Sequence, residues 1–242
     1  MSDLNTSVAD KGIFSRAIGV ITAPGETYRA VIQSPRPAGI LFIVCVVLAL
    51  ATGLPQFTEK GREATVNMQL QQIERSGREV TPQMRTQMET FSRYNGYITM
   101  VSIFVIVPVL SVVFSALYWG VFNTVLGGTA TFKQVMGIVT HAQVIGALGA
   151  IISAPVMYMQ GIASMAGPFN LGALVPMLEP TSAVYRVLTN VNFFTIWQTV
   201  VSAIGLGVLY RRKATPIAIF FVAVYLVVMA GVTLSISSFS QR

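Results

Sequence analysis

The single histidine, His141, is the residue of this sequence best suited to chemistry. It lies in the apolar run 135–157, which contains no Asp, Glu, Lys or Arg. An ionisable side chain within such a run is costly to bury and often functional, so His141 could carry a proton or contact a substrate. The alternative is a neutral packing residue that is hydrogen-bonded to a neighbouring helix, with Gln143 or Asn123 as its partner. We favour the packing interpretation.

Other motifs of enzymes and metal sites are absent from the sequence. It has no Gly-x-Ser-x-Gly, P-loop or His-Glu-x-x-His motif, and no acidic residue lies in an apolar run. The lone Cys45 excludes an intramolecular disulfide and a cysteine-based metal site. Thioethers bind Cu(I), but their irregular spacing disfavours a copper site at Met157, Met159, Met165 and Met177. We therefore predict a protein that is not an enzyme and that has no metal or cofactor.

The composition predicts a polytopic membrane protein. The chain is 53% hydrophobic and 10% charged, with a mean hydropathy of +0.66, whereas soluble domains carry about 25% charged residues. The net charge of +7 could suggest a nucleic-acid partner, but the cations lie in loops and beside apolar runs. Retention of Lys and Arg on the cytoplasmic side explains them better, so we expect no nucleic-acid partner.

Five apolar runs predict an all-α fold, because a segment in lipid must satisfy its own backbone hydrogen bonds. The predicted spans are 38–54, 98–126, 135–157, 193–210 and 215–236. A short turn at Gly127 and Gly128 makes the second and third spans antiparallel neighbours. Residues 38–242 then form one membrane domain, preceded by a cytoplasmic segment, 1–37.

The segment 1–37 contains an amphipathic pattern. One helix face carries the apolar residues Ile13, Phe14, Ala17, Ile18 and Ile21. Such a helix can lie in the membrane interface, with Lys11 and Arg16 near anionic head groups. Alternatively, it packs beneath the membrane domain. No apolar run that could serve as a cleaved signal precedes residue 38, so we expect the first span to be an uncleaved anchor.

The charged loop 56–97 predicts an extramembrane helical hairpin between the first two spans. Ser76 and Gly77 divide it, and Thr81 followed by Pro82 is typical of a helix start. The second helix would present Met84, Met88 and Phe91 on one side. This side is either a docking surface for a partner or part of a solvated hairpin.

Small and polar residues in the spans predict close helix packing. Gly146 and Gly149 each have a small residue four positions later, a spacing that lets helix backbones approach. Asn123 lies near the end of the second span and Trp197 near the start of the fourth. The segment 162–178 is broken by Gly and Pro and could be re-entrant or interfacial.

The charge distribution favours a cytoplasmic N-terminus. Cations divide evenly between the two sides, but those on the N-terminal side lie in shorter segments, and such segments determine orientation. With five spans the C-terminus then lies on the opposite side. We expect a multi-pass integral membrane protein.

Several short motifs are similar to those of a known family. These are Leu-Gly-Gly at 126–128, Phe-Lys-Gln at 132–134, the segments 193–197 and 203–207, the juxtamembrane stretch 21–35 and the loop 170–188. Together they resemble the Yip domain family, the Ypt/Rab-interacting five-span membrane proteins. The resemblance implies five spans, a cytoplasmic N-terminus and no enzymatic activity. The Asp-Leu-Tyr-Gly-Pro motif of the eukaryotic branch is missing, and the charged loop is longer. The chain looks more like the bacterial branch, so the resemblance implies a protein of the bacterial cytoplasmic (inner) membrane. Rab binding is not implied.

Two functions are compatible with the sequence. The first is an integral membrane adaptor or accessory subunit without catalytic activity, which supports another membrane complex in export, lipid transport or membrane organisation. Its partners would be membrane lipids and either another membrane protein or a second copy of the chain. The alternative is a small transporter or channel with His141 lining the path.

Overall fold

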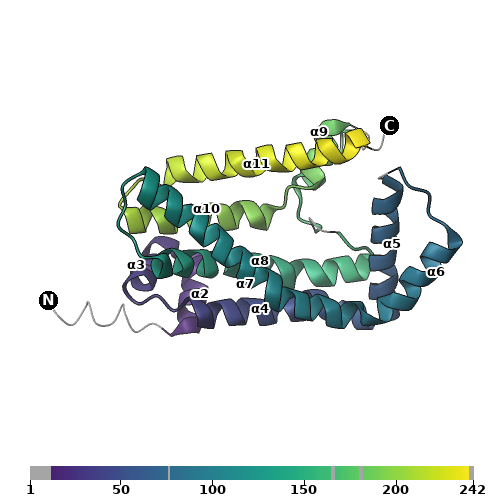
Figure 1. The fold of residues 1–242 in the computed structure, drawn as a ribbon, viewed down its shortest axis with the longest axis horizontal. Helices are drawn as coiled ribbons and strands as arrows, with labels where there is room; N and C mark the ends of the chain where they lie inside the picture. The colour runs from purple at the N-terminus through teal and green to yellow at the C-terminus, as the bar shows by residue number, and fades with distance from the viewer. Residues whose placement is uncertain (1–11, 76, 165–166, 180–181, 240–242) are drawn as a thin grey trace. The chain divides into compact units, whose positions relative to one another are not determined.

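The computed structural model describes residues 12–75, 77–164, 167–179 and 182–239, and these residues are predominantly helical (Figure 1). They include five helical stretches that are long and apolar enough to cross a membrane. These are Pro37–Phe57, Pro82–Val125, Phe132–Gln160, Phe193–Tyr210 and Ala214–Ser235. The sole β-pairing in the described residues is an isolated bridge between Asn170 and Asn192. The prediction of an all-α polytopic membrane protein is confirmed.

The helices follow one another with short connections. In chain order they are α2 (Ile13–Thr22), α3 (Pro24–Gln33), α4 (Pro37–Gly53), η1 (Leu54–Phe57), α5 (Glu59–Arg75), α6 (Pro82–Phe91), η2 (Ser92–Tyr94), α7 (Asn95–Gly120), the π-helix η3 (Val121–Val125), α8 (Phe132–Gln160), η4 (Leu171–Leu174), α9 (Ala183–Thr189), α10 (Phe193–Tyr210) and α11 (Ala214–Phe239).

The chain divides into two compact units, and the long helices contribute to both. Unit 1 comprises the chain up to Val47, Phe104–Leu148 and Trp197–Val222. Unit 2 comprises Leu48–Ile103, Gly149–Ile196 and the chain from Ala223. We describe the contacts of each unit separately.

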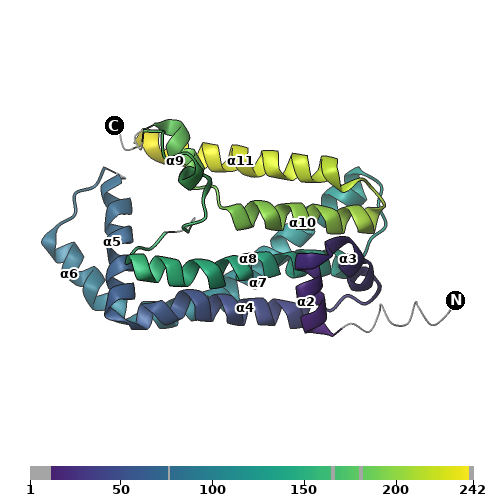
Figure 2. The ribbon, with the colours of Figure 1, turned by 180° about the vertical axis from the view of Figure 1, so that it is seen from behind.

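In unit 1, the first half of α8 carries much of the core. Its residues Val135, Ile138, Ala142 and Ile145 are buried. The short helices α2 and α3 lie side by side (Figures 1 and 2). Pro24 occupies the first turn of α3. The N–H that proline lacks would have no hydrogen-bond partner within the helix at this position. The two helices therefore supply a packed juxtamembrane layer.

Helices α7 and α11 remain largely exposed although they are strongly apolar. The most apolar window of the α7 stretch is 11% buried and that of α11 is 6% buried, against 56% for α8. Exposed apolar side chains are favourable when lipid surrounds them and unfavourable in water. We infer that α7 and α11 face the bilayer over most of their length.

In unit 2, α5 and α6 form the predicted hairpin between the first two spans (Figure 1). The Oγ1 atom of Thr81 accepts a hydrogen bond from Met84 N at 3.2 Å, so the predicted helix cap is confirmed. Helix α5 is only partly exposed to solvent. It buries Ala64, Val66 and Leu70, of which Val66 and Leu70 lie one turn apart on the same side of the helix.

The segment after α8 is mostly irregular. Between residues 162 and 178 the described residues contain one short helix, η4, and residues 165–166 lie outside the description. Residues 180–181 also lie outside it. Ser182 caps α9, with its Oγ accepting from Tyr185 N at 3.2 Å. Whether this segment is re-entrant stays a prediction.

Candidate functional site

His141 is buried in unit 1, with 1% of its surface exposed. Its Nδ1 lies 2.7 Å from the carbonyl oxygen of Gly137, one turn earlier in α8. Since a carbonyl can only accept, Nδ1 carries the hydrogen in this contact. The predicted partners Gln143 and Asn123 are wrong, because each of them is hydrogen-bonded elsewhere. The contact with its own helix fixes the ring of His141 as part of the core.

Gln143 joins α8 to α7. Its Nε2 donates to Ser111 Oγ at 2.7 Å, and Ser111 Oγ donates in turn to Val107 O at 2.6 Å. The Gln143 Oε1 atom is buried and has no hydrogen-bond partner within the described residues. Polar contacts between helices in a membrane each contribute about 0.6 kcal/mol on average. This pair is therefore a modest cross-link between two spans.

We expect Ser111→Ala to destabilise the protein by about 0.6–1.7 kcal/mol, because the Gln143 amide loses its partner on α7. The matched control is Ser115→Ala. Ser115 is equally buried on α7 but donates to Ser111 O of its own helix, so its loss should have little effect. The measurement is unfolding in mixed micelles with a denaturing detergent. Equal effects of the two changes would contradict the cross-link.

Asn123 and Gly128 organise the turn between α7 and α8. Asn123 Nδ2 donates to Ala130 O at 2.7 Å, and its Oδ1 accepts from Tyr210 OH at 2.9 Å. An added Cβ at Gly128 would lie 2.5 Å from the Tyr210 ring. Gly127 has a φ of +71°, a left-handed conformation that favours glycine. These three predicted residues are thus brought together at one turn.

Gly146 and Gly149 lie where α8 meets α10. An added Cβ at Gly146 would lie 2.7 Å from Gln198 Oε1 within unit 1. In unit 2, a Cβ at Gly149 would lie 2.6 Å from the Phe194 ring. The missing side chains therefore leave room for α10. Trp197, the remaining predicted residue, is partly buried on α10.

Sequence reasoning missed the role of Arg16. One of the two interpretations of its helix placed it near lipid head groups, but its exposed fraction is 1%. Its guanidinium donates to Ser34 O at 2.7 Å. The signal was the spacing of Arg16 and Val20, four residues apart on the buried side of α2. Arg16 thus ties α2 to the end of α3.

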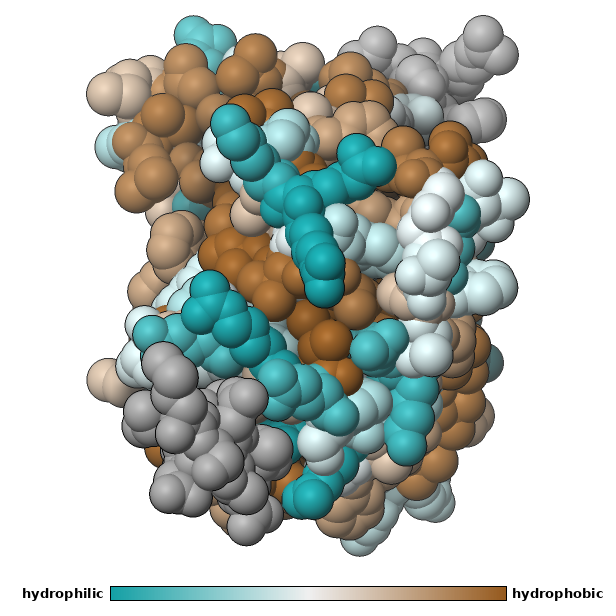
Figure 3. Space-filling model, turned by 90° about the vertical axis from the view of Figure 1, so that its left-hand side faces the viewer, coloured by the Kyte–Doolittle hydropathy of each residue, from teal (hydrophilic) through white to brown (hydrophobic). Residues whose placement is uncertain are grey.

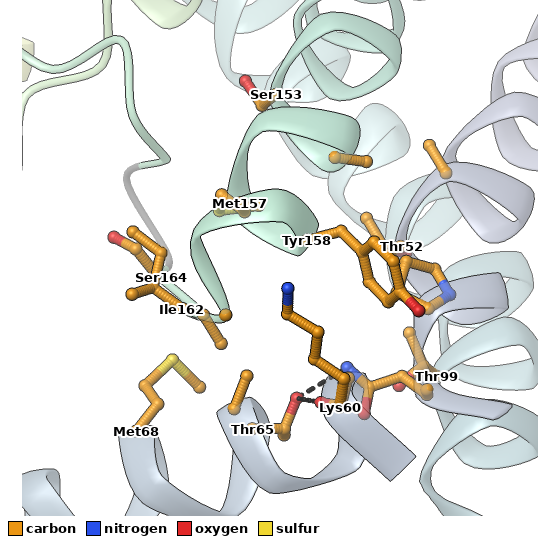
Figure 4. A pocket seen from close by; sticks show the side chains of 18 of the residues that line it. Thr52, Lys60, Thr65, Met68, Thr99, Ser153, Met157, Tyr158, Ile162 and Ser164 are labelled. Carbon is orange, nitrogen blue, oxygen red and sulfur yellow. Dashed lines mark hydrogen bonds between the residues drawn. The ribbon is translucent and has the colours of Figure 1, made fainter. Parts of the chain in front are cut away.

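A pocket of about 380 Å³ lies within unit 2. Ala51 of α4 and Ala154 and Met157 of α8 contribute apolar lining, and Lys60 and Thr65 of α5 contribute polar lining. Figure 4 shows Lys60 reaching between Tyr158 on one side and Ile162 and Ser164 on the other. No prediction from the sequence pointed to this pocket, because its walls come from segments far apart in the chain.

Lys60 is held at the pocket by two contacts. Its Nζ donates to Met159 O at 3.0 Å and lies 5.4 Å from the centre of the Tyr158 ring. The second distance is that of a cation–π contact. These contacts place an ammonium group beside an otherwise largely apolar cavity.

No metal centre is apparent in the described part of the chain, where no group of three His, Cys, Asp or Glu could hold an ion. Among the methionines considered for copper, Met157 lines the pocket, whereas Met159 and Met177 are exposed. Met165 lies outside the described residues. The absence of a copper site stays a prediction.

The five apolar helices and the lipid-facing surfaces of α7 and α11 define a polytopic helical membrane protein. The sequence model of the Yip1 domain matches residues 18–236, so the chain belongs to the Yip1 domain family. It is similar to the membrane protein YknW of Bacillus subtilis (strain 168), with 24% identity over 190 residues, 78% of this chain and 75% of that protein. No solved structure matches the chain. The resemblance seen in the sequence is confirmed, and the family is not a known enzyme family.

Proposed function

We propose that the protein is a non-catalytic membrane adaptor or accessory subunit that supports another membrane complex. The observation that carries this proposal is an aromatic edge in unit 2, formed by Phe91, Tyr94 and Tyr97. Their exposed fractions are 68%, 60% and 62%. Exposed aromatic clusters are typical anchors of protein interfaces, and this one follows directly from the extramembrane hairpin.

The aromatic edge overlaps only in part with the docking surface expected from the sequence. Phe91 belongs to both, but Met84 and Met88 are half-buried. They lie in α6, which contacts α5. The proposed docking surface therefore centres on Phe91 and Tyr94. Membership of the Yip1 domain family and the missing catalytic motifs support a role in assembly.

The proposed setting is the bacterial cytoplasmic membrane with the N-terminus inside. The bacterial relative supports it, as do the exposed cations in the short segments of unit 1. These cations are Arg29, Arg36, Lys133, Arg211, Arg212 and Lys213. The face shown in Figure 3 has hydrophilic and hydrophobic residues side by side, as expected near a membrane surface. The process served is export, lipid transport or membrane organisation.

The double change Phe91→Ser and Tyr94→Ser should reduce recovery of the partner about tenfold or more, because aromatic anchors dominate interface energies. The measurement is affinity purification of the tagged chain from native membranes in a mild detergent, with quantitative mass spectrometry. The matched control is Phe14→Ser with Ile18→Ser, which removes exposed apolar residues of α2.

A partner retained equally by the wild-type chain and the double variant would contradict the docking surface. If the chain came out alone or with further copies of itself, a separate partner complex would be contradicted. The transporter alternative has less support, because His141 is buried, bonded to its own helix and not part of the pocket lining. Substrate flux through reconstituted vesicles would reverse this order.

A further inference from the structure

The pocket of unit 2 is lined both by residues within spanning helices and by residues of α5. Ala150 and Ala154 of α8 line one part, and Ala150 lies ten residues, roughly 15 Å, before the end of that helix. Lys60 lines another part and follows the end of the spanning stretch Pro37–Phe57 in the chain. The cavity therefore extends from the body of one span to a group that lies beyond the end of another.

The polar part of the pocket offers a cation. Lys60 has three N–H donors, and its one hydrogen bond among the described residues goes to Met159 O. A fitting ligand would bring an anionic group to Lys60.

We propose that this pocket binds a single-chain anionic amphiphile whose head group carries a phosphate. The phosphate lies at Lys60, and the acyl chain follows Ala154 and Ala150 into the membrane. The volume of about 380 Å³ suits one head group with part of one chain, since small-molecule sites measure roughly 300–1,000 Å³. This proposal is independent of the adaptor function, because it uses neither Phe91 nor Tyr94.

The direct test is equilibrium binding of radiolabelled lysophosphatidylglycerol to the delipidated full-length chain in a neutral detergent. We expect saturable binding of one molecule per chain. Two competitors separate the parts of the ligand: monoacylglycerol has the chain without phosphate, and glycerol 3-phosphate has the phosphate without a chain. Both should compete at least about tenfold more weakly than unlabelled lysophosphatidylglycerol.

Two pairs of variants locate the site. Lys60→Met keeps the apolar stem but removes the charge, and it should weaken binding about tenfold or more. Lys133→Met makes the same change on an exposed lysine of unit 1 and should leave binding unchanged. Ala154→Leu fills the pocket and should abolish binding, whereas Ala154→Ser should retain it. Thermal unfolding in the same detergent checks that each variant is folded.

The proposal is overturned if lysophosphatidylglycerol does not bind, or if Lys60→Met binds it as tightly as the wild-type chain. Equal competition by monoacylglycerol would overturn the role of the phosphate. Equal competition by glycerol 3-phosphate would show a site for soluble phosphate esters instead of lipids. The variant with serine at positions 91 and 94 should bind lysophosphatidylglycerol normally, so failure of the adaptor function and failure of this site can be told apart.

Discussion

Tyr28→Ala is expected to lower the free energy of unfolding by about 3–5 kcal/mol, as for other large aromatic residues removed from a core. The Tyr28 side chain is fully buried in unit 1. Its ring lies 3.1 Å from the position of a Cβ added to Gly205, and its hydroxyl lies 3.4 Å from Ile138 O. Tyr28 therefore joins α3 to α8 and α10. Removing the ring leaves a cavity where three helices meet.

The control for this change is Tyr28→Phe. It keeps the ring and removes the long hydrogen bond to Ile138 O, so the loss should be about 1 kcal/mol or less. Both variants can be compared by unfolding in mixed micelles with a denaturing detergent. If Tyr28→Ala lowered the free energy of unfolding no more than Tyr28→Phe, the role of the ring in joining the three helices would be contradicted.

Burial also makes the contribution of Tyr28 dependent on pH. Desolvation raises the pKa of the Tyr28 phenol above its ordinary value. An exposed phenol in the unfolded chain ionises at about pH 10, while the buried phenol stays protonated. The contribution of the Tyr28 phenol to the free energy of unfolding is therefore fully present below about pH 10. Above pH 10 the free energy of unfolding falls by about 1.4 kcal/mol per pH unit because of this one group. Tyr28→Phe should remove this part of the decline, as measured by unfolding between pH 9 and pH 11.

The number of spans could be predicted from the sequence because a chain segment in lipid must satisfy its own backbone hydrogen bonds. A long uncharged run has no alternative to a helix in a bilayer, and all five runs are helical. Helix α8 begins at Phe132, three residues before the apolar run 135–157. The signal was present, since Thr131 and Gln134 form a capping box: Gln134 N donates to Thr131 Oγ1 at 3.3 Å, and Thr131 N donates to Gln134 Oε1 at 3.0 Å.

The pocket and the position of Arg16 could not be predicted in this way. Periodicity identifies the apolar side of a helix, but it does not say which partner covers that side. In α2 the strongly apolar Phe14 is exposed, whereas Arg16 is buried against the chain after α3. Lys60 and Tyr158 come from distant segments, and their contact depends on how α5 meets the end of α8. Such tertiary contacts are not periodic in the sequence.

Gly205 of α10 packs against the Tyr28 ring. Replacing Gly205 with a larger residue should lower the free energy of unfolding nearly as much as removing the ring. An added Cβ would lie 2.5 Å from Ile138 Cγ2 as well as 3.1 Å from the Tyr28 ring. Neither neighbour can move away easily, because both are fully buried. Gly205→Ala should therefore cost about 1–3 kcal/mol, and Gly205→Leu about 3 kcal/mol or more.

The matched control for Gly205→Ala is Gly120→Ala. Gly120 also belongs to a spanning helix, but an added Cβ there meets nothing within 4 Å. Alanine favours helix more than glycine does, so this change should be neutral or stabilising by up to about 1 kcal/mol. Opposite signs for the two substitutions in the same unfolding assay would show that contact with α3 and α8, and not helix propensity, requires glycine at position 205. If Gly205→Ala were as harmless as Gly120→Ala, the close approach of α10 to these two helices would be contradicted.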